Sequence, residues 1–430
     1  MMRLAFVLIH RFVGLAIAAF LFVAGLTGSV ISWDREIDRW LNPQLFNAAS
    51  QSEPLAPLDL AGRVEASDPR GFVTYLPLHT KPGDSVSMLV DARADPATGK
   101  LFDLGYDQVF IDPVTGVILG KREWGVIGLD RQHLIPFLYK LHYSLCIPEL
   151  WGIDTWGVWL MGGIALLWIV DCFVGFYLTL PMRRRAVKDS RRANWWGRWK
   201  PAWRIKWGGS GFRMNFDIHR ALGLWTWILL FILAVTAASL NLYKEVAQPV
   251  VAFFSTFTPT PSDLRTPAPK NAPIMPQLST SEILVRARAE AGRRQWQEPP
   301  GAIGYIQQIG VYSVRFFERG DDHGAAGVGP AELYFDGEDG RYLGDRLPWH
   351  GTAGDLFLQI QFPLHSGRIA GIGGRIFISF MGLVVATLSI TGVVVWWKKY
   401  RARVSQARKQ NVTISSRLAE LNSGSSRMTK

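Results

Sequence analysis

The chain has 430 residues, 48% of which are hydrophobic, and a formal net charge of +12. This charge does not indicate a nucleic-acid-binding protein, because it is concentrated: twelve Lys or Arg and only two Asp lie between Arg183 and Arg220. The two cysteines, Cys146 and Cys172, form no CxxC, CxxCH or iron–sulfur spacing. Their separation along a mostly helical path argues against a disulfide.

Four long apolar stretches decide the class of protein. Three of them carry no charged residue, and the second is interrupted only by Asp171. The stretches cover residues 12–33, 155–182, 221–243 and 376–397. Each exceeds the roughly 20 residues that span the hydrocarbon core of a bilayer. The sequence therefore predicts four membrane helices.

The first stretch has an alternative interpretation as a cleaved signal peptide. Arg3 precedes it, and the small residues AGLTGS end it. However, its apolar run is too long for the core of a signal. The heptapeptide that opens it, IHRFVGL at 9–15, also has an internal counterpart, IHRALGL at 218–224. We therefore interpret it as a membrane helix.

The basic segments set the predicted orientation, since short basic loops stay in the cytoplasm. The middle loop and the tail after Trp397 are both basic. We expect the N-terminus, this loop and the tail in the cytoplasm of a bacterium, and the inner membrane as the location. The predicted divisions are 4–33 (membrane), 34–151 (periplasm), 152–182 (membrane), 183–219 (cytoplasm), 220–243 (membrane), 244–364 (periplasm), 365–397 (membrane) and 398–430 (cytoplasm).

An internal repeat organises these segments. Besides the two heptapeptides, VFIDPVTGVILGKR at 109 matches LYFDGEDGRYLGDR at 333, and LHYSL at 141 matches LHSGR at 364. Each half reads as His-Arg, membrane helix, external segment, Leu-His, membrane helix. Because both halves start on the same side, the pattern predicts a four-helix bundle built from a parallel tandem repeat.

The two external segments are predicted to be small α+β modules. Helices are expected at LDLAGRVEA and, with a capping box, at STSEILVRARAEAG. Strand-like runs follow in both halves: GFVTYLPL, DSVSMLVDA, DQVFID, AIGYIQQI, GVYSVRFF and AELYFD. DPVTG and DGEDG suit tight hairpin turns. A Pro-rich connector, 256–276, leads into the second module.

The loop NWWGRWKPAWRIKWGG, residues 194–209, mixes Trp with Arg and Lys. This composition is typical of a segment that lies among lipid headgroups. An ordinary cytoplasmic loop with a belt of Trp explains it equally well.

Four of the eight histidines occupy corresponding positions of the repeat, at the ends of membrane helices. His10 and His219 start outward-going helices, and His142 and His365 precede inward-going ones. Topology therefore predicts one facing pair at each membrane edge. Two imidazoles from facing helices can bind a haem iron axially. They make a poor structural zinc site, which needs four ligands.

A single histidine at a helix end is more often an interfacial residue or a cap partner, but two pairs in a shared context favour ligands. Arg11 and Arg220 adjoin the inner pair, and Arg368 and Arg375 follow His365. Haem propionates need such cations, although Arg at a helix end is usually a topology anchor.

Three further residues are candidates for the site. His133 and His350 lie outside, near the membrane, and could be substitute ligands or line an outer substrate site. Asp171 lies in the middle of the second span, where an ionisable group usually faces the bundle interior. It could take part in a proton or quinol step, or be a buried neutral acid bonded to backbone. His79 and His323 are expected on the exposed surface.

The repeated IHRxxGL, the external IDPVTGVILG and the LH before the next span resemble the PepSY-associated transmembrane family, over about residues 5–400. Similar members include FoxB-type and PiuB-type inner-membrane proteins of iron–siderophore uptake. The resemblance implies haem b held by bis-histidine ligation, with His10 and His219 carrying one haem and His142 and His365 the other. It also implies reduction of ferric siderophores on the periplasmic side. The external segments resemble degenerate PepSY domains, and DGEDG departs from the family pattern.

These features favour a transmembrane electron conduit: an oxidoreductase with two haem b groups that reduces a ferric siderophore and releases iron(II). No Gly-rich dinucleotide motif occurs in strand–helix context, so a cytoplasmic or quinol electron donor is expected. Two alternatives stay open. One is a non-enzymatic membrane protein whose modules bind a peptidase, peptidoglycan or an uptake partner, and the other is a haem reductase for another acceptor.

Overall fold

A computed structural model describes residues 2–48, 52–182, 194–321 and 323–425. Part of the predicted basic loop, 183–193, and the last five residues of the predicted tail lie outside the described residues. The chain divides into two compact units. The helical unit comprises Met1–Leu26, Ile164–Val235 and Met381–Lys430, and the sheet unit comprises Thr27–Gly163 and Thr236–Phe380.

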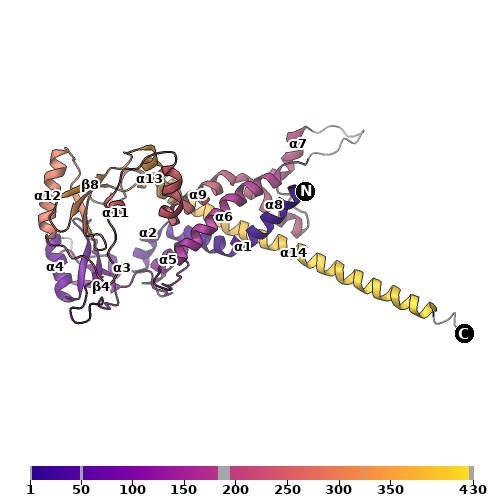
Figure 1. Ribbon diagram of the computed structural model, residues 1–430, viewed down its shortest axis with the longest axis horizontal. Coiled ribbons are helices and arrows are strands. Elements are labelled where there is room, and N and C mark those ends of the chain that lie inside the picture. The colour runs from indigo at the N-terminus through magenta and orange to yellow at the C-terminus, as the bar shows by residue number, and fades with distance from the viewer. Residues whose placement is uncertain (1, 49–51, 183–193, 322, 426–430) are drawn as a thin grey trace. The chain divides into compact units, whose positions relative to one another are not determined.

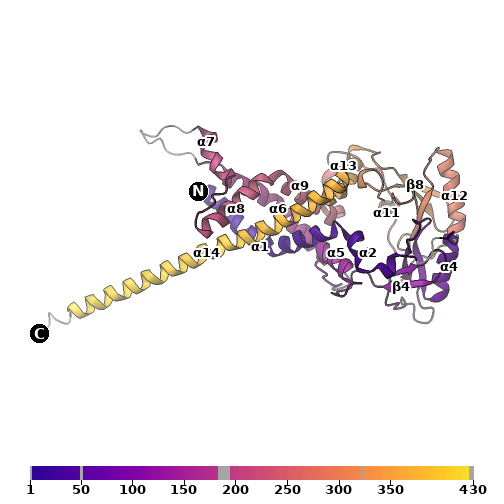
Figure 2. The ribbon, with the colours of Figure 1, turned by 180° about the vertical axis from the view of Figure 1, so that it is seen from behind.

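Among the described residues, three helices are long and apolar enough to cross a membrane, so the chain is a membrane protein. These are α1 (Met2–Ile31), α6 (Trp156–Thr179) and the span Arg368–Ala407, most of which belongs to α14 (Gly371–Ser425). Figure 2 shows α14 as one uninterrupted helix, which continues beyond the predicted end of the fourth span at 397.

The predicted third span is not a straight helix. It consists of α8 (Gly211–Trp225) and α9 (Trp227–Asn241), which are bent by 70° relative to each other. At the break, both the backbone N–H and the hydroxyl of Thr226 donate to the carbonyl of Leu222. The side chain thus shares an acceptor with the helical backbone, which is a known cause of helix bending. The structure therefore contains three candidate spans, or four if the bent pair crosses as one.

One eight-stranded antiparallel sheet dominates the sheet unit, with the order β4-β3-β2-β1-β5-β6-β7-β8. The strands are β1 (Gly71–Pro77), β2 (Val86–Ala92), β3 (Gln108–Ile111), β4 (Ile118–Arg122), β5 (Pro300–Ile306), β6 (Val311–Phe316), β7 (Ala331–Asp336) and β8 (Tyr342–Arg346). DPVTG and DGEDG link β3 to β4 and β7 to β8, as predicted. Gly116 and Gly340 take φ of 69° and 72° there, a conformation that glycine adopts without strain.

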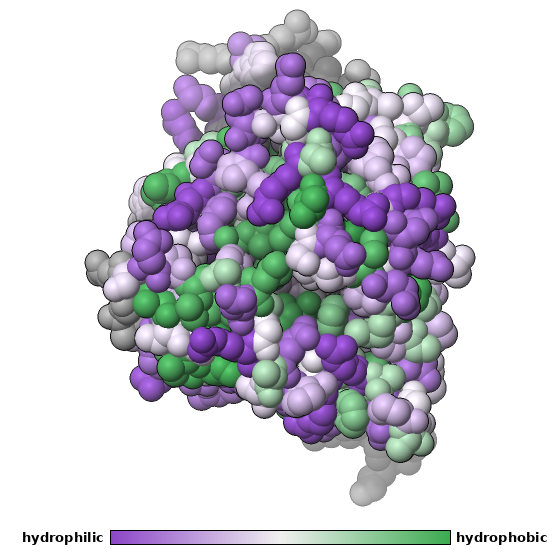
Figure 3. Space-filling model, turned by 90° about the vertical axis from the view of Figure 1, so that its left-hand side faces the viewer, coloured by the Kyte–Doolittle hydropathy of each residue, from purple (hydrophilic) through white to green (hydrophobic). Residues whose placement is uncertain are grey.

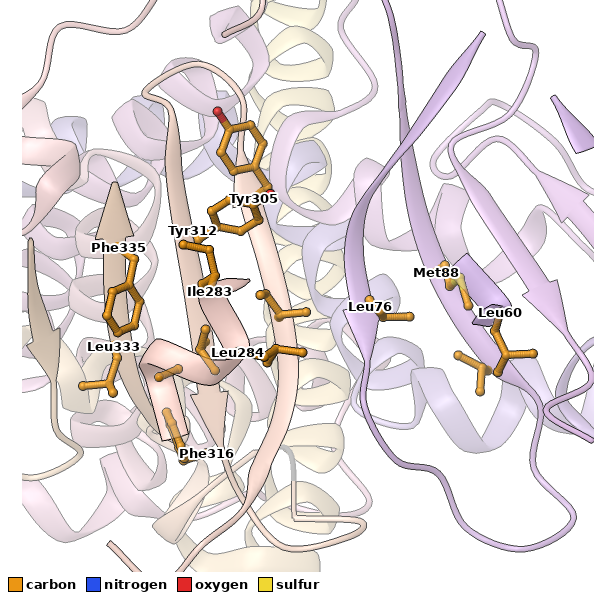
Figure 4. Close-up of a cluster of buried hydrophobic side chains, with 14 of the residues drawn as sticks. Leu60, Leu76, Met88, Ile283, Leu284, Tyr305, Tyr312, Phe316, Leu333 and Phe335 are labelled. Carbon is orange, nitrogen blue, oxygen red and sulfur yellow. The ribbon is translucent and has the colours of Figure 1, made fainter. Parts of the chain in front are cut away.

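Two helices cover one face of this sheet, α4 (Pro57–Ser67) and α12 (Thr280–Arg293) (Figure 1). The predicted capping box of α12 is confirmed, because the Ser279 hydroxyl accepts from the Glu282 N–H while the Glu282 carboxylate accepts from the Ser279 N–H. Leu60 of α4 and Ile283 of α12 belong to one buried cluster that includes strand residues of both halves (Figure 4).

The two external segments are not separate modules. β1 pairs with β5, with Tyr75 opposite Gly304, so both halves contribute four strands to one sheet and share one hydrophobic core. The sequence could not predict this junction, because each segment already contains a complete helix-and-strand pattern.

Hydrophilic residues cover much of the side that carries α4 and α12, with apolar patches between them (Figure 3).

Two short helices carry the histidines expected to precede the spans. His142 lies near the end of α5 (Leu134–Ser144) and His365 near the end of α13 (Ala353–Ser366). They are therefore not on the spanning helices themselves. The remaining helical segments are α2 (Asp34–Leu41), α3 (Pro43–Phe46), α7 (Trp195–Trp199), η1 (Lys200–Trp203), η2 (Tyr243–Ala247), α10 (Gln248–Ala252), α11 (Pro261–Leu264), η3 (Ala325–Gly327) and η4 (Arg368–Ala370).

A buried ion pair ties α2 to the sheet. The Arg122 guanidinium on β4 donates to both carboxylate oxygens of Asp38, at 2.7 and 3.1 Å, and the two side chains are 3% and 8% exposed. Asn42 also donates to Asp38 at 2.8 Å. A planar, two-bond pair of this kind keeps both buried charges satisfied.

We predict that Asp38→Asn lowers the stability of the sheet unit by about 3–5 kcal/mol, because it leaves the Arg122 charge buried without its partner. The measurement is the urea midpoint for proteolysis of the external segments in the full chain. Asp154→Asn is the control, since it breaks an exposed ion pair with Lys270 that is worth less than about 1 kcal/mol. Equal shifts in both variants would contradict the prediction.

Candidate bis-histidine sites

The first histidine pair lies in the helical unit. His10 on α1 and His219 on α8 have ring centroids 6.1 Å apart. Both rings line a cavity of about 460 Å³, which α6 and α14 also line. This volume is within the range of about 300–1,000 Å³ that is typical of sites for small molecules and cofactors.

The Nδ1 partners of this pair determine what the rings can do. His10 Nδ1 is 2.9 Å from Asp171 Oδ1, and His219 Nδ1 is 3.1 Å from the Leu388 carbonyl and 3.0 Å from Thr391 Oγ1. A carbonyl only accepts, so His219 Nδ1 carries the proton. An ionised carboxylate fixes the same tautomer in a neutral His10. In both rings the lone pair therefore belongs to Nε2, the nitrogen that can bind a metal.

Glycines on the neighbouring helices allow the rings to pack closely. A Cβ added at Gly175 of α6 would lie 3.5 Å from His10 Cε1, and one at Gly392 of α14 would lie 3.1 Å from His219 Cε1. Four helices thus build this site: α1 and α8 carry the rings, while α6 and α14 supply both the hydrogen-bond partners and the space.

Two arginines at the cavity have unsatisfied nitrogens. Among the described residues, the Nε atoms of Arg11 and Arg220 are buried without a hydrogen-bond partner. The Arg220 Nη2 donates to the Pro201 carbonyl and to Asp217 Oδ1. Buried guanidinium nitrogens of this kind can receive an anionic group.

The second pair lies in the sheet unit and repeats the same geometry. The ring centroids of His142 and His365 are also 6.1 Å apart. His142 Nδ1 is 3.1 Å from Thr27 Oγ1, and His365 Nδ1 is 2.9 Å from Thr236 Oγ1. A Cβ added at Gly28 would lie 2.9 Å from His142 Cε1. In this pair too, each ring and its Nδ1 partner lie on different helices.

The separation of the rings fits two imidazoles on one iron. A metal–nitrogen bond of about 2 Å plus about 1 Å from nitrogen to ring centre, on both sides, separates the ring centres by about 6 Å. The observed 6.1 Å in each pair agrees with this value. By contrast, the described residues contain no group of three or more His, Cys, Asp or Glu that could hold a metal ion. The residues present therefore fit an axially ligated haem better than a metal ion held by side chains alone.

The other predicted site residues lie in different settings. His133 Nδ1 bonds to Asp130 at 2.8 Å, and this contact lowers the pKa of the Asp130 carboxyl. His350 is exposed, and its Nδ1 donates to the Pro348 carbonyl at 2.8 Å. In both residues Nδ1 contacts a neighbour in the same loop, and their roles as substitute ligands or at an outer substrate site stay predictions.

The second set of predicted cations is engaged by acidic residues. Arg368 is 3.8 Å from Asp34, and Arg375 forms a two-bond pair with Glu36.

The prediction that His79 lies on the exposed surface was wrong. Its ring is partly buried and packs edge-to-face on Phe317, whose carbonyl it contacts at 3.1 Å.

Several residues around the two histidine pairs were not predicted from the sequence. Thr27 and Thr236 were missed, although each follows its His-Arg motif at the same interval, 27 − 10 = 236 − 219 = 17. Asp171 was singled out but not paired with His10, since the two are 161 positions apart. The chain contains 42 glycines, and no sequence pattern distinguishes those that face the rings from the others.

Comparison with known proteins gives the family. A family model described as the PepSY-associated TM region matches residues 7–399. No curated protein matches the chain. Since the match extends over both histidine pairs and nearly the whole length, the chain belongs to the PepSY-associated TM region family.

Proposed function

We propose that this membrane protein holds two haem b groups, one between His10 and His219 and one between His142 and His365, and passes electrons across the inner membrane to a ferric siderophore. The observation that carries the proposal is the agreement between the pairs. In both, two imidazoles from different helices stand 6.1 Å apart, and each ring is hydrogen-bonded through Nδ1.

The protein's part in this function is to hold and orient. Asp171, the Leu388 carbonyl, Thr27 and Thr236 fix the ring orientations, which would hold the imidazoles in place as ligands of a bound haem iron. Arg11 and Arg220 would bind the propionates at the first pair. A haem with two histidine ligands supplies one-electron transfer.

A ferric siderophore is the proposed acceptor on chemical grounds. One electron converts iron(III) into iron(II), a softer and less highly charged ion that hard oxygen ligands hold less tightly. The predicted orientation puts the external segments, which form the sheet, in the periplasm, on the side where such a chelate arrives. An acceptor of this kind is what the resemblance to the FoxB-type and PiuB-type members of the family implies. The donor would be a quinol or a cytoplasmic reductant.

We predict that the purified protein contains about two haem b per chain, with a low-spin spectrum that sharpens on reduction by dithionite. His142→Ala or His365→Ala should remove about half of the haem, and His10→Ala or His219→Ala the other half. The measurement is the pyridine haemochrome content per chain. Colourless protein from haem-replete cells would refute the proposal and favour the non-enzymatic alternative.

The close packing at Gly28 supplies a subtler test. Gly28→Ala should remove up to half of the haem or shift one of its absorption bands, because the new methyl group would meet the His142 ring at 2.9 Å. Gly163→Ala is the matched control in another spanning helix, since a Cβ there meets nothing within 4 Å. Identical haem content and spectra in the two variants would argue against ligation by His142.

The acceptor is tested with reduced protein in proteoliposomes. Ferric hydroxamate or catecholate chelates added outside should reoxidise the haem and yield iron(II), which ferrozine traps. The same chelates loaded with gallium(III), which cannot be reduced under these conditions, should leave the haem reduced. Reoxidation by quinones or flavins alone, with no response to any ferric chelate, would favour a reductase for another acceptor.

A further inference from the structure

The two histidine pairs differ in the chemistry of their Nδ1 partners. In the first pair, His10 faces the carboxylate of Asp171 at 2.9 Å. In the second pair, both partners are threonine hydroxyls, Thr27 and Thr236. The other ring of the first pair also has a neutral Nδ1 partner. His219 contacts the backbone carbonyl of Leu388.

We infer that Asp171 is a positioning residue that lowers the reduction potential of the iron held by His10 and His219 below that of the iron held by His142 and His365, so that electrons run from the first pair to the second. The inference rests on the proposed haem binding. It deepens the proposal by giving the conduit a direction.

The placement of Asp171 supports a specific role. The residue is buried, with 9% exposure, within an apolar span of α6, where an ionisable group is costly unless it is paired. Its other carboxylate oxygen faces Gly14, where an added Cβ would lie 4.0 Å away. Helix α1 thus supplies both the ring and the space beside the carboxylate.

The direction of the effect follows from the chemistry of the hydrogen bond. A carboxylate accepts the Nδ1 proton more strongly than a hydroxyl or a carbonyl does, and so gives the ring more imidazolate character. A more basic ring donates more electron density through Nε2 and favours iron(III) over iron(II). The nearby negative charge acts in the same sense. A threonine hydroxyl is a weaker acceptor and carries no charge, so the second pair keeps the higher potential.

The test is an optical redox titration of Asp171→Asn in detergent-solubilised full-length protein. Asparagine can still accept the His10 Nδ1–H through its carbonyl but carries no charge. The wild type should titrate in two waves, and the variant should move only the lower wave upward at unchanged haem content. Asp171→Glu, which restores the charge, should recover part of the difference. Glu53→Gln, an exposed substitution with the same change of charge, should leave both waves in place.

The outcomes separate this inference from the proposed function. Protein without haem refutes the proposed function. Two haems with both waves unmoved in Asp171→Asn refute the role of Asp171, while the haem sites stand. Movement of the upper wave instead would mean that the iron held by His10 and His219 has the higher potential. This result would refute the inferred direction of electron flow. If Asp171→Asn loses haem, the test uses Asp171→Glu with two haems. Displacement of the lower wave alone would support the inference, and two unmoved waves or a displaced upper wave would overturn it.

Discussion

The hydrogen bond at Nδ1 is the interaction on which the arrangement of both histidine pairs depends. An imidazole inside a helical bundle cannot leave a ring nitrogen without a partner at low cost. Each of the four rings meets this constraint with an acceptor or hydroxyl on another helix: Asp171 and Leu388 in the helical unit, Thr27 and Thr236 in the sheet unit. The bond fixes the direction of the ring and, where Nδ1 donates, puts the lone pair on Nε2.

Helix packing follows from the same requirement. A ring can reach an acceptor on a neighbouring helix only if that helix comes close, and small residues permit this approach. Gly175 and Gly392 stand where a side chain would meet the rings of His10 and His219. The break at Thr226 has a related effect, because it separates α8, which carries His219, from α9, which carries Thr236. The two helices of this one predicted span therefore contribute to both histidine pairs, α8 with His219 and α9 with Thr236.

The sheet unit shows a different way of joining two halves. Tyr75 of β1 pairs with Gly304 of β5, and this contact converts two four-stranded pieces into one sheet. The pairing removes an exposed edge from each piece, which protects both against pairing with another chain. It also lets α4 and α12 share one core, so that neither segment has to bury a complete core of its own.

The amino-acid sequence by itself determined the class of protein, the strands and hairpin turns, and the four histidines. All of these depend on local patterns: charge-free length, alternation of side chains, Asp-Gly turns and a repeated heptapeptide. Only the tertiary structure decided that Asp171 meets His10, that Thr27 and Thr236 support the second pair, and that β1 joins β5. These contacts link residues more than a hundred positions apart. No local pattern specifies such partners, because they depend on which helices and strand edges pack together.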